Sequence, residues 1–284
     1  AADPRLAAWM ECDKVSRVLV HSYPSTKWQP TCAEYAEMVA GYFGADSPLA
    51  YRLGVGKELR TEHGNRQLTP VNDRWAFGLT TIMVAGGHWS IQHDSHAALV
   101  CGDAVRAGVS GQTEVSHLFS DLLPPNSRGP HDGIRPDFVS GRTLYDFKML
   151  HFTPGTYTLR HVLKQDAHAR PTLSPVDMRA HKVHSEYVAA ARKLDRLHYS
   201  NIVDADQRPV YKRLLEYGEV KGLAVGAFGG FSKAGHELLD ATIESAAEHH
   251  WQSAGARTEV GAKSIFALQY RRRHGCAAAL GFAK

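Results

Sequence analysis

Two aspartates and a lysine lie close together near the middle of the chain, in a pattern that suits metal-dependent hydrolysis. Asp137 follows a proline, and Asp146 and Lys148 are separated by one residue in the next apolar stretch. Carboxylate oxygens are the ligands that Mg²⁺ and Mn²⁺ prefer in proteins. A lysine beside them can orient a water molecule or stabilise the negative charge of a reacting phosphate. These residue types therefore predict a divalent metal site that hydrolyses a phosphate ester.

A β-hairpin would bring the two aspartates together. Residues 134–140 and 143–150 are candidate strands, and Gly141-Arg142 suits a two-residue turn of type II′. This register sets Ser140 opposite Thr143, Val139 opposite Leu144 and Asp137 opposite Asp146, with Lys148 on the face of Asp146. Opposed carboxylates repel unless a cation lies between them, and a slip of one residue would separate the three side chains. An acid and a lysine at this spacing also occur on solvated strands, so the hairpin is what favours a metal site.

The elements around this hairpin predict an α/β fold. Apolar residues at helical spacing follow His93, and Gly108 provides a helix stop. Further strands are expected at 114–119 and 219–228, and further helices at 175–199, 233–251 and 262–280. The order is α-β-β-β-α-β-α-α, which indicates a mixed central sheet flanked by helices.

The helix at 175–199 has the clearest local signals. Ser174 is a suitable N-cap, Pro175 lies in the first turn, and Asp177 is the acid three residues after the cap. Apolar residues then recur every three or four positions, at Val176, Ala180, Val183, Tyr187, Ala190, Leu194 and Leu197. This spacing predicts one buried helix face.

Residues 1–90 are expected to form a helical N-terminal region that precedes a single domain at 91–284. Helices are predicted at 7–20 and 32–43, and the polar stretch 54–72 is predicted to be irregular. Residues 74–84 suit either a strand or a buried helix. The chain starts at Ala1 rather than at a Met. This suggests that a transit peptide has been removed, that the sequence was cut at an arbitrary point, or that the chain is part of a larger polyprotein.

The composition limits the classes of protein to which the chain belongs. Among 284 residues, 43% are hydrophobic and 22% are charged, which is enough to bury a sizeable core. No apolar run approaches the roughly 18 residues of a membrane span. The net charge of +4 permits a nucleic-acid partner but does not require one. The four cysteines lie far apart and favour a reducing, intracellular compartment, whether nucleus or organelle such as the mitochondrion.

Pro136-Asp137 followed by Asp146-Phe147-Lys148, within this order of elements, resembles the PD-(D/E)XK nuclease superfamily over about residues 93–228. The resemblance implies a restriction-endonuclease-like α-β-β-β-α-β core. It also implies that Asp137 and Asp146 bind Mg²⁺ or Mn²⁺, that Lys148 is the catalytic lysine, and that the Phe147 carbonyl is a further ligand. Members often carry an additional acid upstream, for which Asp94 and Glu114 are both candidates. Polar residues of the following helix, here Lys182, His184 and Glu186, often lie near the site in this family, although a solvated helix face is the more common explanation for such residues.

A narrower resemblance is to the endonuclease-like domains attached to the reverse transcriptases of some retroelements. It rests on His93-Asp94, on the segment from Arg135 to Phe138, and on the segment from Leu144 to Lys148. Those domains usually have a zinc knuckle just upstream. Here no cysteine lies between Cys32 and Cys101, so the chain departs from that pattern, which puts specific DNA docking in doubt.

Basic residues provide candidate contacts with a phosphate backbone. They are Arg135, Lys182, Arg271, Arg272 and Arg273. The three consecutive arginines also suit a solvated face, or a contact with an acidic protein or ribosomal RNA. The combined expectation is a Mg²⁺-dependent endonuclease that hydrolyses phosphodiester bonds in DNA. The alternative is a catalytically retired nuclease-like fold that serves as a structural or nucleic-acid-binding subunit of a large assembly, such as an organellar ribonucleoprotein.

Overall fold

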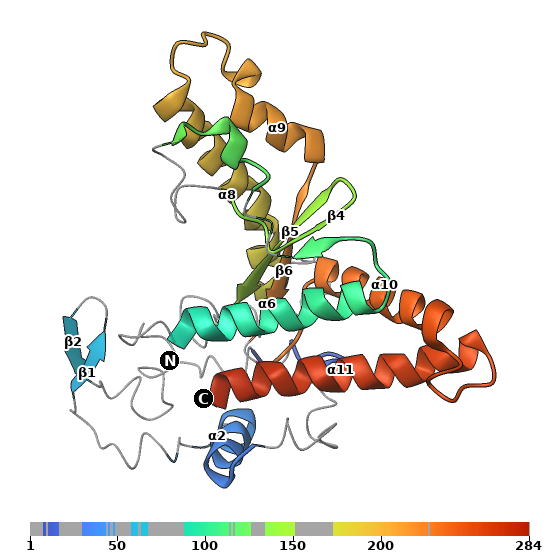
Figure 1. The fold of residues 1–284 in the computed structure, drawn as a ribbon. Coiled ribbons are helices and arrows are strands. Elements are labelled where there is room, and N and C mark those ends of the chain that lie inside the picture. The colour runs from blue at the N-terminus through green and yellow to red at the C-terminus, as the bar shows by residue number, and fades with distance from the viewer. Residues whose placement is uncertain are drawn as a thin grey trace, which may run out of the picture.

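The protein has an α/β fold in which a mixed sheet lies between two groups of helices (Figure 1). The computed structural model describes residues 8–9, 11–16, 30–43, 45, 48, 58–61, 64–67, 88–113, 115, 117–125, 134–150, 173–226 and 228–283. The α/β class predicted from the sequence is confirmed.

The sheet contains β3 (Gln112–Thr113), β4 (Phe138–Ser140), β5 (Thr143–Met149) and β6 (Val220–Val225), in the order β3-β4-β5-β6. The first two pairs are antiparallel, and β5 pairs with β6 in parallel. The hairpin register is as predicted, with Phe138 opposite Tyr145, Val139 opposite Leu144 and Ser140 opposite Thr143. Gly141 in the turn has a φ of 56°, in the left-handed region that glycine enters without strain.

Alternation along β5 sends neighbouring side chains into two separate cores. Phe147 packs toward α6 (His88–Arg106), α10 (Lys233–His250) and α11 (Glu259–Ala283). Leu144 packs toward α8 (Pro175–His198) and α9 (Pro209–Tyr217) on the other face. In Figure 1 these two groups of helices lie on opposite sides of the strands. Residues of β5 that are one apart therefore face different helices.

The long helix α8 begins as the sequence predicts, because the Ser174 hydroxyl accepts a hydrogen bond from the Asp177 N–H. Its buried face differs from the predicted one in the second half. Ala191 and Asp195 are buried, whereas Ala190 and Leu197 are exposed. A helix with 3.6 residues per turn drifts away from a strict alternation of three and four, so the predicted stripe moves toward the edge of the core after Tyr187, where Leu194 is only partly buried.

The first half of α8 packs directly on β6 at Gly222. A Cβ atom added at Gly222 would lie 2.5 Å from the Ala180 Cα atom. No side chain separates the helix from the strand at this point, so the close approach requires glycine.

The short helix α9 was not predicted. Its first N–H groups are capped by a side chain of α8, since the buried Asp195 carboxylate accepts hydrogen bonds from Val210 at 3.0 Å and from Tyr211 at 2.8 Å. A short 3-10 helix, Ala205–Gln207, precedes it. The cap comes from a residue that is distant along the chain, which explains why local patterns do not reveal this helix.

Two other predictions are corrected before the hairpin. The described residues of the strand predicted at 114–119, which are 115 and 117–119, belong to no strand. Leu118 and Phe119 form a turn that leads to the 3-10 helix Ser120–Leu122, and β3 lies earlier, at Gln112–Thr113. Val115 and Phe119 are buried as anchors of this loop rather than as alternate residues of a strand. The strand predicted at 134–140 begins only at Phe138. Pro136 has no N–H group to donate to the neighbouring strand, so the hydrogen-bonded ladder does not continue through it.

The N-terminal region is only partly as predicted. Helix α2 (Cys32–Phe43) is confirmed, and it begins with reciprocal hydrogen bonds between Thr31 and Glu34. Part of the stretch predicted to be irregular forms a hairpin of β1 (Glu58–Thr61) and β2 (Gly64–Gln67). Of the helix predicted at 7–20, residues 8–9 are helical, whereas residues 11–16 form turns and a 3-10 step. Residues 74–84 lie outside the described residues.

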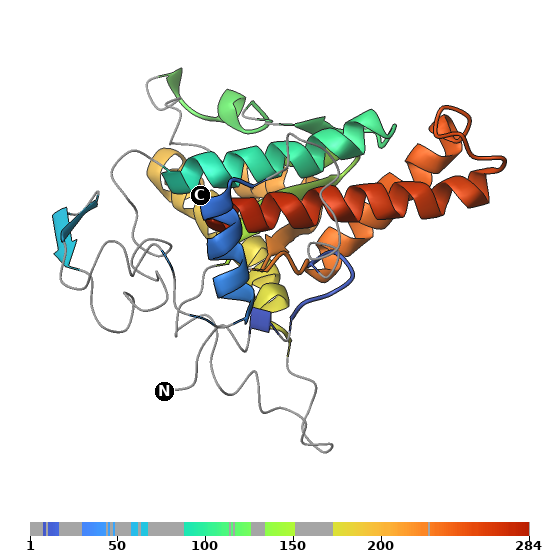
Figure 2. The ribbon, with the colours of Figure 1, turned by 90° about the horizontal axis from the view of Figure 1, so that it is seen from below.

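Helix α2, Glu11 and Asp13 of the N-terminal region pack on the predicted nuclease-like domain. Helix α2 lies against α11, as Figure 2 shows. Glu11 accepts a hydrogen bond from the Val176 N–H at 3.1 Å, and Asp13 accepts one from the Phe231 N–H at 2.9 Å. Within the described part of the chain, no helix combines the length and apolar character of a membrane span.

Candidate active site

Asp146 and Lys148 form the buried half of the predicted site. Both lie on the α8 face of β5, as the alternation predicts, and Asp146 is only 5% exposed. The Lys148 Nζ atom lies 2.5 Å from Asp146 Oδ2. Among the described residues Oδ2 has no hydrogen-bond partner, so this contact is an ion pair. On the other side, the Tyr187 hydroxyl of α8 lies 2.9 Å from Asp146 Oδ1 and 3.0 Å from the Arg135 carbonyl oxygen.

Asp137 lies just before β4, at the end of the hairpin ladder. Its N–H donates to the Tyr145 carbonyl at 3.0 Å, and its Oδ2 accepts a hydrogen bond from the Phe147 N–H at 2.6 Å. The observed pairing ends at Phe138, so Asp137 and Asp146 are not a regular cross-strand pair. Instead, the Asp137 side chain takes the place of a backbone acceptor for β5.

The negative charges of Asp137 and Asp146 repel each other. Burial, followed by the negative charge of Asp146, raises the pKa of Asp137. The hydrogen bond from Phe147 and the nearby His93 and Lys148 act in the opposite direction without cancelling this effect. Two carboxylates that resist simultaneous ionisation are stabilised when a dication binds beside them.

His93 of α6 forms a hydrogen bond with the Phe147 carbonyl, which was predicted as a further metal ligand. Its Nε2 atom lies 2.7 Å from the Phe147 oxygen and donates to it, because a carbonyl can only accept. Its Nδ1 atom lies 3.0 Å from Asp94 Oδ1. Asp94, one of the two upstream acids, is therefore linked to β5 through His93. Glu114, the other candidate, lies outside the described residues.

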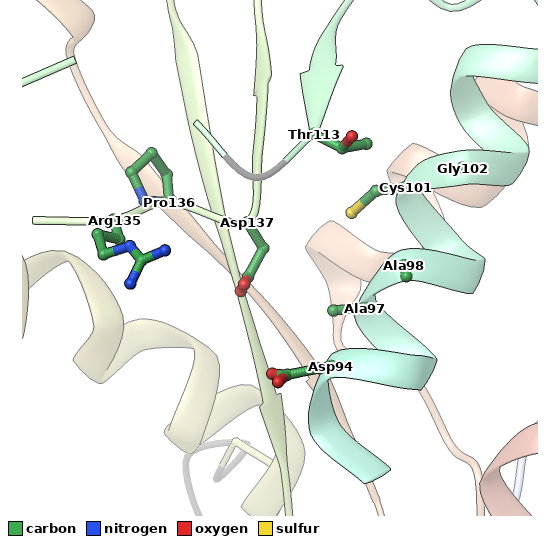
Figure 3. A pocket seen from close by; sticks show the side chains of 9 residues that line it. All are labelled: Asp94, Ala97, Ala98, Cys101, Gly102, Thr113, Arg135, Pro136 and Asp137. Atoms are coloured by element: carbon green, nitrogen blue, oxygen red, sulfur yellow. The ribbon is translucent and has the colours of Figure 1, made fainter. Parts of the chain in front are cut away.

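Asp94 and Asp137 line one pocket of about 440 Å³ between α6 and the segment before β4. Figure 3 shows their carboxylates pointing toward each other from opposite walls. The remaining lining residues are Ala97, Ala98, Cys101, Gly102, Thr113, Arg135 and Pro136. Small side chains on α6 leave this space open beside the two acids. Burial, then the charge of Asp137, raises the pKa of Cys101 to about 12, so its thiol stays protonated.

The donor atoms suit a hard divalent cation. Among the described residues, no group of three or more His, Cys, Asp or Glu side chains converges on one point. The fit rests on Asp137 and Asp146. Asp137 has a raised pKa, and Asp146 has a buried oxygen, Oδ2, whose partner within the described part of the chain is the Lys148 ammonium group. Mutually repelling, buried carboxylate oxygens are the ligands that Mg²⁺ and Mn²⁺ select.

Most residues predicted to contact a nucleic acid are not gathered at this pocket. Arg135 lines it, and Lys182 is exposed on α8. Arg273 instead forms an ion pair with Asp103, which is buried on α6. Arg271 lies 3.8 Å from Asp240, and the Nε atoms of Arg271 and Arg272 are buried. Arg271 and Arg273 thus help to join α11 to α10 and α6.

The other polar residues proposed on α8 also have structural partners. His184 Nδ1 accepts a hydrogen bond from the Val220 N–H at 3.2 Å, and Glu186 pairs with Arg179 at 2.8 Å. The residue of α8 that contacts Asp146 is Tyr187, which was predicted only as part of an apolar face. The sequence feature that could have indicated this role is the hydroxyl of Tyr187 in an otherwise apolar helix face.

Comparisons of the chain with protein-family models, with curated proteins and with solved structures found no significant match.

Proposed function

We propose that the protein is a metal-dependent endonuclease that hydrolyses phosphodiester bonds in DNA and has a PD-(D/E)XK core. The observation that carries this proposal is the arrangement of Asp137, Asp146 and Lys148 at the end of one hairpin. The negative charges of the two aspartates repel each other, and the Lys148 Nζ atom lies 2.5 Å from Asp146 Oδ2. The order of α6, β3, β4, β5, α8 and β6, with β5 and β6 parallel, supports the same assignment.

Asp137 and Asp146 would hold Mg²⁺ or Mn²⁺, with Asp94 and the Phe147 carbonyl as additional oxygen donors. When bound, the metal polarises the phosphate and lowers the pKa of a bound water molecule. Lys148 places a positive charge beside the acids, where it stabilises negative charge developing on the phosphate. Tyr187 fixes the orientation of Asp146, and Arg135 lines the pocket where the phosphate backbone would enter.

Cleavage of plasmid and single-stranded DNA in Mg²⁺ or Mn²⁺ tests the proposal. Asp146→Asn keeps the shape of the side chain but removes its charge, and we expect cleavage to fall by more than about 100-fold, since even the partners of metal ligands are worth about 10–100-fold. Asp121→Asn is the matched control, because Asp121 is an exposed aspartate paired with Arg213. Equal metal-dependent cleavage by wild type and Asp146→Asn would refute the assignment.

One observation favours the alternative of a retired nuclease-like scaffold. Asp146 is already held by Lys148 and Tyr187, and the Phe147 carbonyl is held by His93, so the site is satisfied within the chain. A scaffold of this kind would bind nucleic acid or a large assembly without metal. The absence of cleavage by both wild type and Asp146→Asn, together with metal-independent binding of nucleic acid, would support the scaffold.

A further inference from the structure

The peptide groups of Phe147 are held from two sides. The Phe147 N–H donates to Asp137 Oδ2 at 2.6 Å, and the Phe147 carbonyl accepts from His93 Nε2 at 2.7 Å. His93 then contacts Asp94 Oδ1 at 3.0 Å. A continuous chain of polar contacts therefore joins the segment before β4, the centre of β5 and the start of α6. It contains three of the oxygen-bearing groups predicted to bind metal.

We propose that His93 is a positioning residue that holds the Phe147 carbonyl and the Asp94 carboxylate in place for the metal site. The proposal rests on the proposed function, because it concerns the same metal ligands. It adds that the site depends on α6, and not only on the hairpin that carries the acid and lysine residues.

The exposure of the two partners explains why His93 matters. The Asp94 side chain is 74% exposed, and its described contact within the chain is His93. An exposed carboxylate samples several rotamers, so its direction depends on that contact. The His93 side chain is only 21% exposed, and its ring packs edge-on against the Phe147 ring at 5.5 Å. A ring that is packed on one side can orient a solvated partner on the other.

The helix that carries His93 is itself anchored. Asp103 of α6 is buried and forms ion pairs with Arg106 and with Arg273 of α11. Breaking a buried ion pair is strongly unfavourable, so this connection resists movement of α6 relative to α11. His93 therefore transmits a fixed helix position to Phe147 and Asp94.

Calorimetric titration of the full chain with Mn²⁺ tests the proposal. His93→Phe keeps the ring packing but removes both nitrogen atoms, and we expect Mn²⁺ to bind about 10–100-fold more weakly. His93→Gln keeps an N–H donor for the Phe147 carbonyl, and we expect its affinity to lie closer to that of wild type. His236→Ala is the matched control. His236 is 24% exposed and lies 2.7 Å from the Asp13 carboxylate, but it does not line the pocket.

Amide exchange in β5 separates a positioning role from a loss of structure. Asp137 still accepts from the Phe147 N–H in His93→Phe, so we expect the protection of β5 amides to persist. If β5 loses protection, His93→Ala repeats the comparison without the larger ring. Wild-type Mn²⁺ affinity in a folded His93→Phe, or no Mn²⁺ binding by wild type, would overturn the inference. If wild type binds Mn²⁺ in a His93-dependent manner but cleaves no DNA, the inference stands and the proposed nuclease activity fails.

Discussion

Tyr187→Phe removes one oxygen atom from the centre of the proposed site without changing the volume of the ring. The hydroxyl lies within hydrogen-bonding distance of Asp146 Oδ1 and of the Arg135 carbonyl. Burial, followed by the charge of Asp146, raises the pKa of Tyr187 far above its ordinary value of 10.0, so the hydroxyl remains a donor at every working pH. The substitution therefore removes a permanent donor from a buried carboxylate.

The magnitude of the effect follows from the single phenolic proton. Two acceptors share it, so their hydrogen bonds do not add, and the bond to the charged carboxylate dominates. Such a bond contributes about 1.5–3 kcal/mol. Because Phe fills the same space, no cavity adds to this value. We therefore expect the free energy of unfolding to fall by about 1.5–3 kcal/mol, by the same amount at pH 6 and pH 9.

Urea denaturation at these two pH values provides the measurement, with Tyr35→Phe on the exposed face of α2 as the control. A loss below about 0.5 kcal/mol, the range of ordinary surface substitutions, would show that Tyr187 does not hold Asp146. A loss that disappears at pH 9 would contradict the raised pKa of the hydroxyl.

Substitutions at Asp137 and Asp195 test the repulsion between the two acids and the cap of α9. Folding raises the pKa of Asp137 above its ordinary value of 3.8. The protein therefore loses stability as the pH rises from 3.8 through the pKa that Asp137 has in the folded state. Asp137→Asn, which still offers an oxygen to the Phe147 N–H, should therefore raise the free energy of unfolding at pH 8 by about 0.5–2 kcal/mol and have less effect at pH 4; equal shifts in urea denaturation at both would contradict this. Asp195→Ala removes the acceptor of two N–H groups of α9 and should cost about 1–3 kcal/mol, with faster amide exchange confined to α9. Asp195→Asn keeps one oxygen acceptor and should cost less, and unchanged exchange in α9 would show that the cap is dispensable.

The parts of the fold that were predicted correctly depend on signals within a few residues. Ser174 and Pro175 mark the start of α8, and Gly141 marks the hairpin turn, because each acts on its own neighbours. The start of α9 depends instead on Asp195, which belongs to a different helix. The polar strands β1 and β2 lack alternating apolar residues, so no periodicity distinguishes them from a loop.

The same distinction applies to the candidate site. Alternation along one strand was enough to place Asp146 and Lys148 on one face. The position of Asp137 was predicted less well, because the ladder was extended past Pro136 and the Phe147 N–H was given no side-chain partner. Tyr187 and His93 reach the site from helices distant in the chain, and only the three-dimensional fold brings them to β5.

The contacts of residues 11–16 have a consequence for synthesis on the ribosome. Glu11 binds a backbone N–H 165 positions later, and Asp13 binds one 218 positions later. Since translation proceeds from the N-terminus, both carboxylates emerge long before Val176 and Phe231 exist. Asp13 can bind the nearby Val15 and Ser16 N–H groups at once, whereas its contact with Phe231 must wait until β6 has been made. This segment is translated before the residues that bind it, so a stalled or shortened product that ends before Phe231 lacks the backbone N–H that binds Asp13.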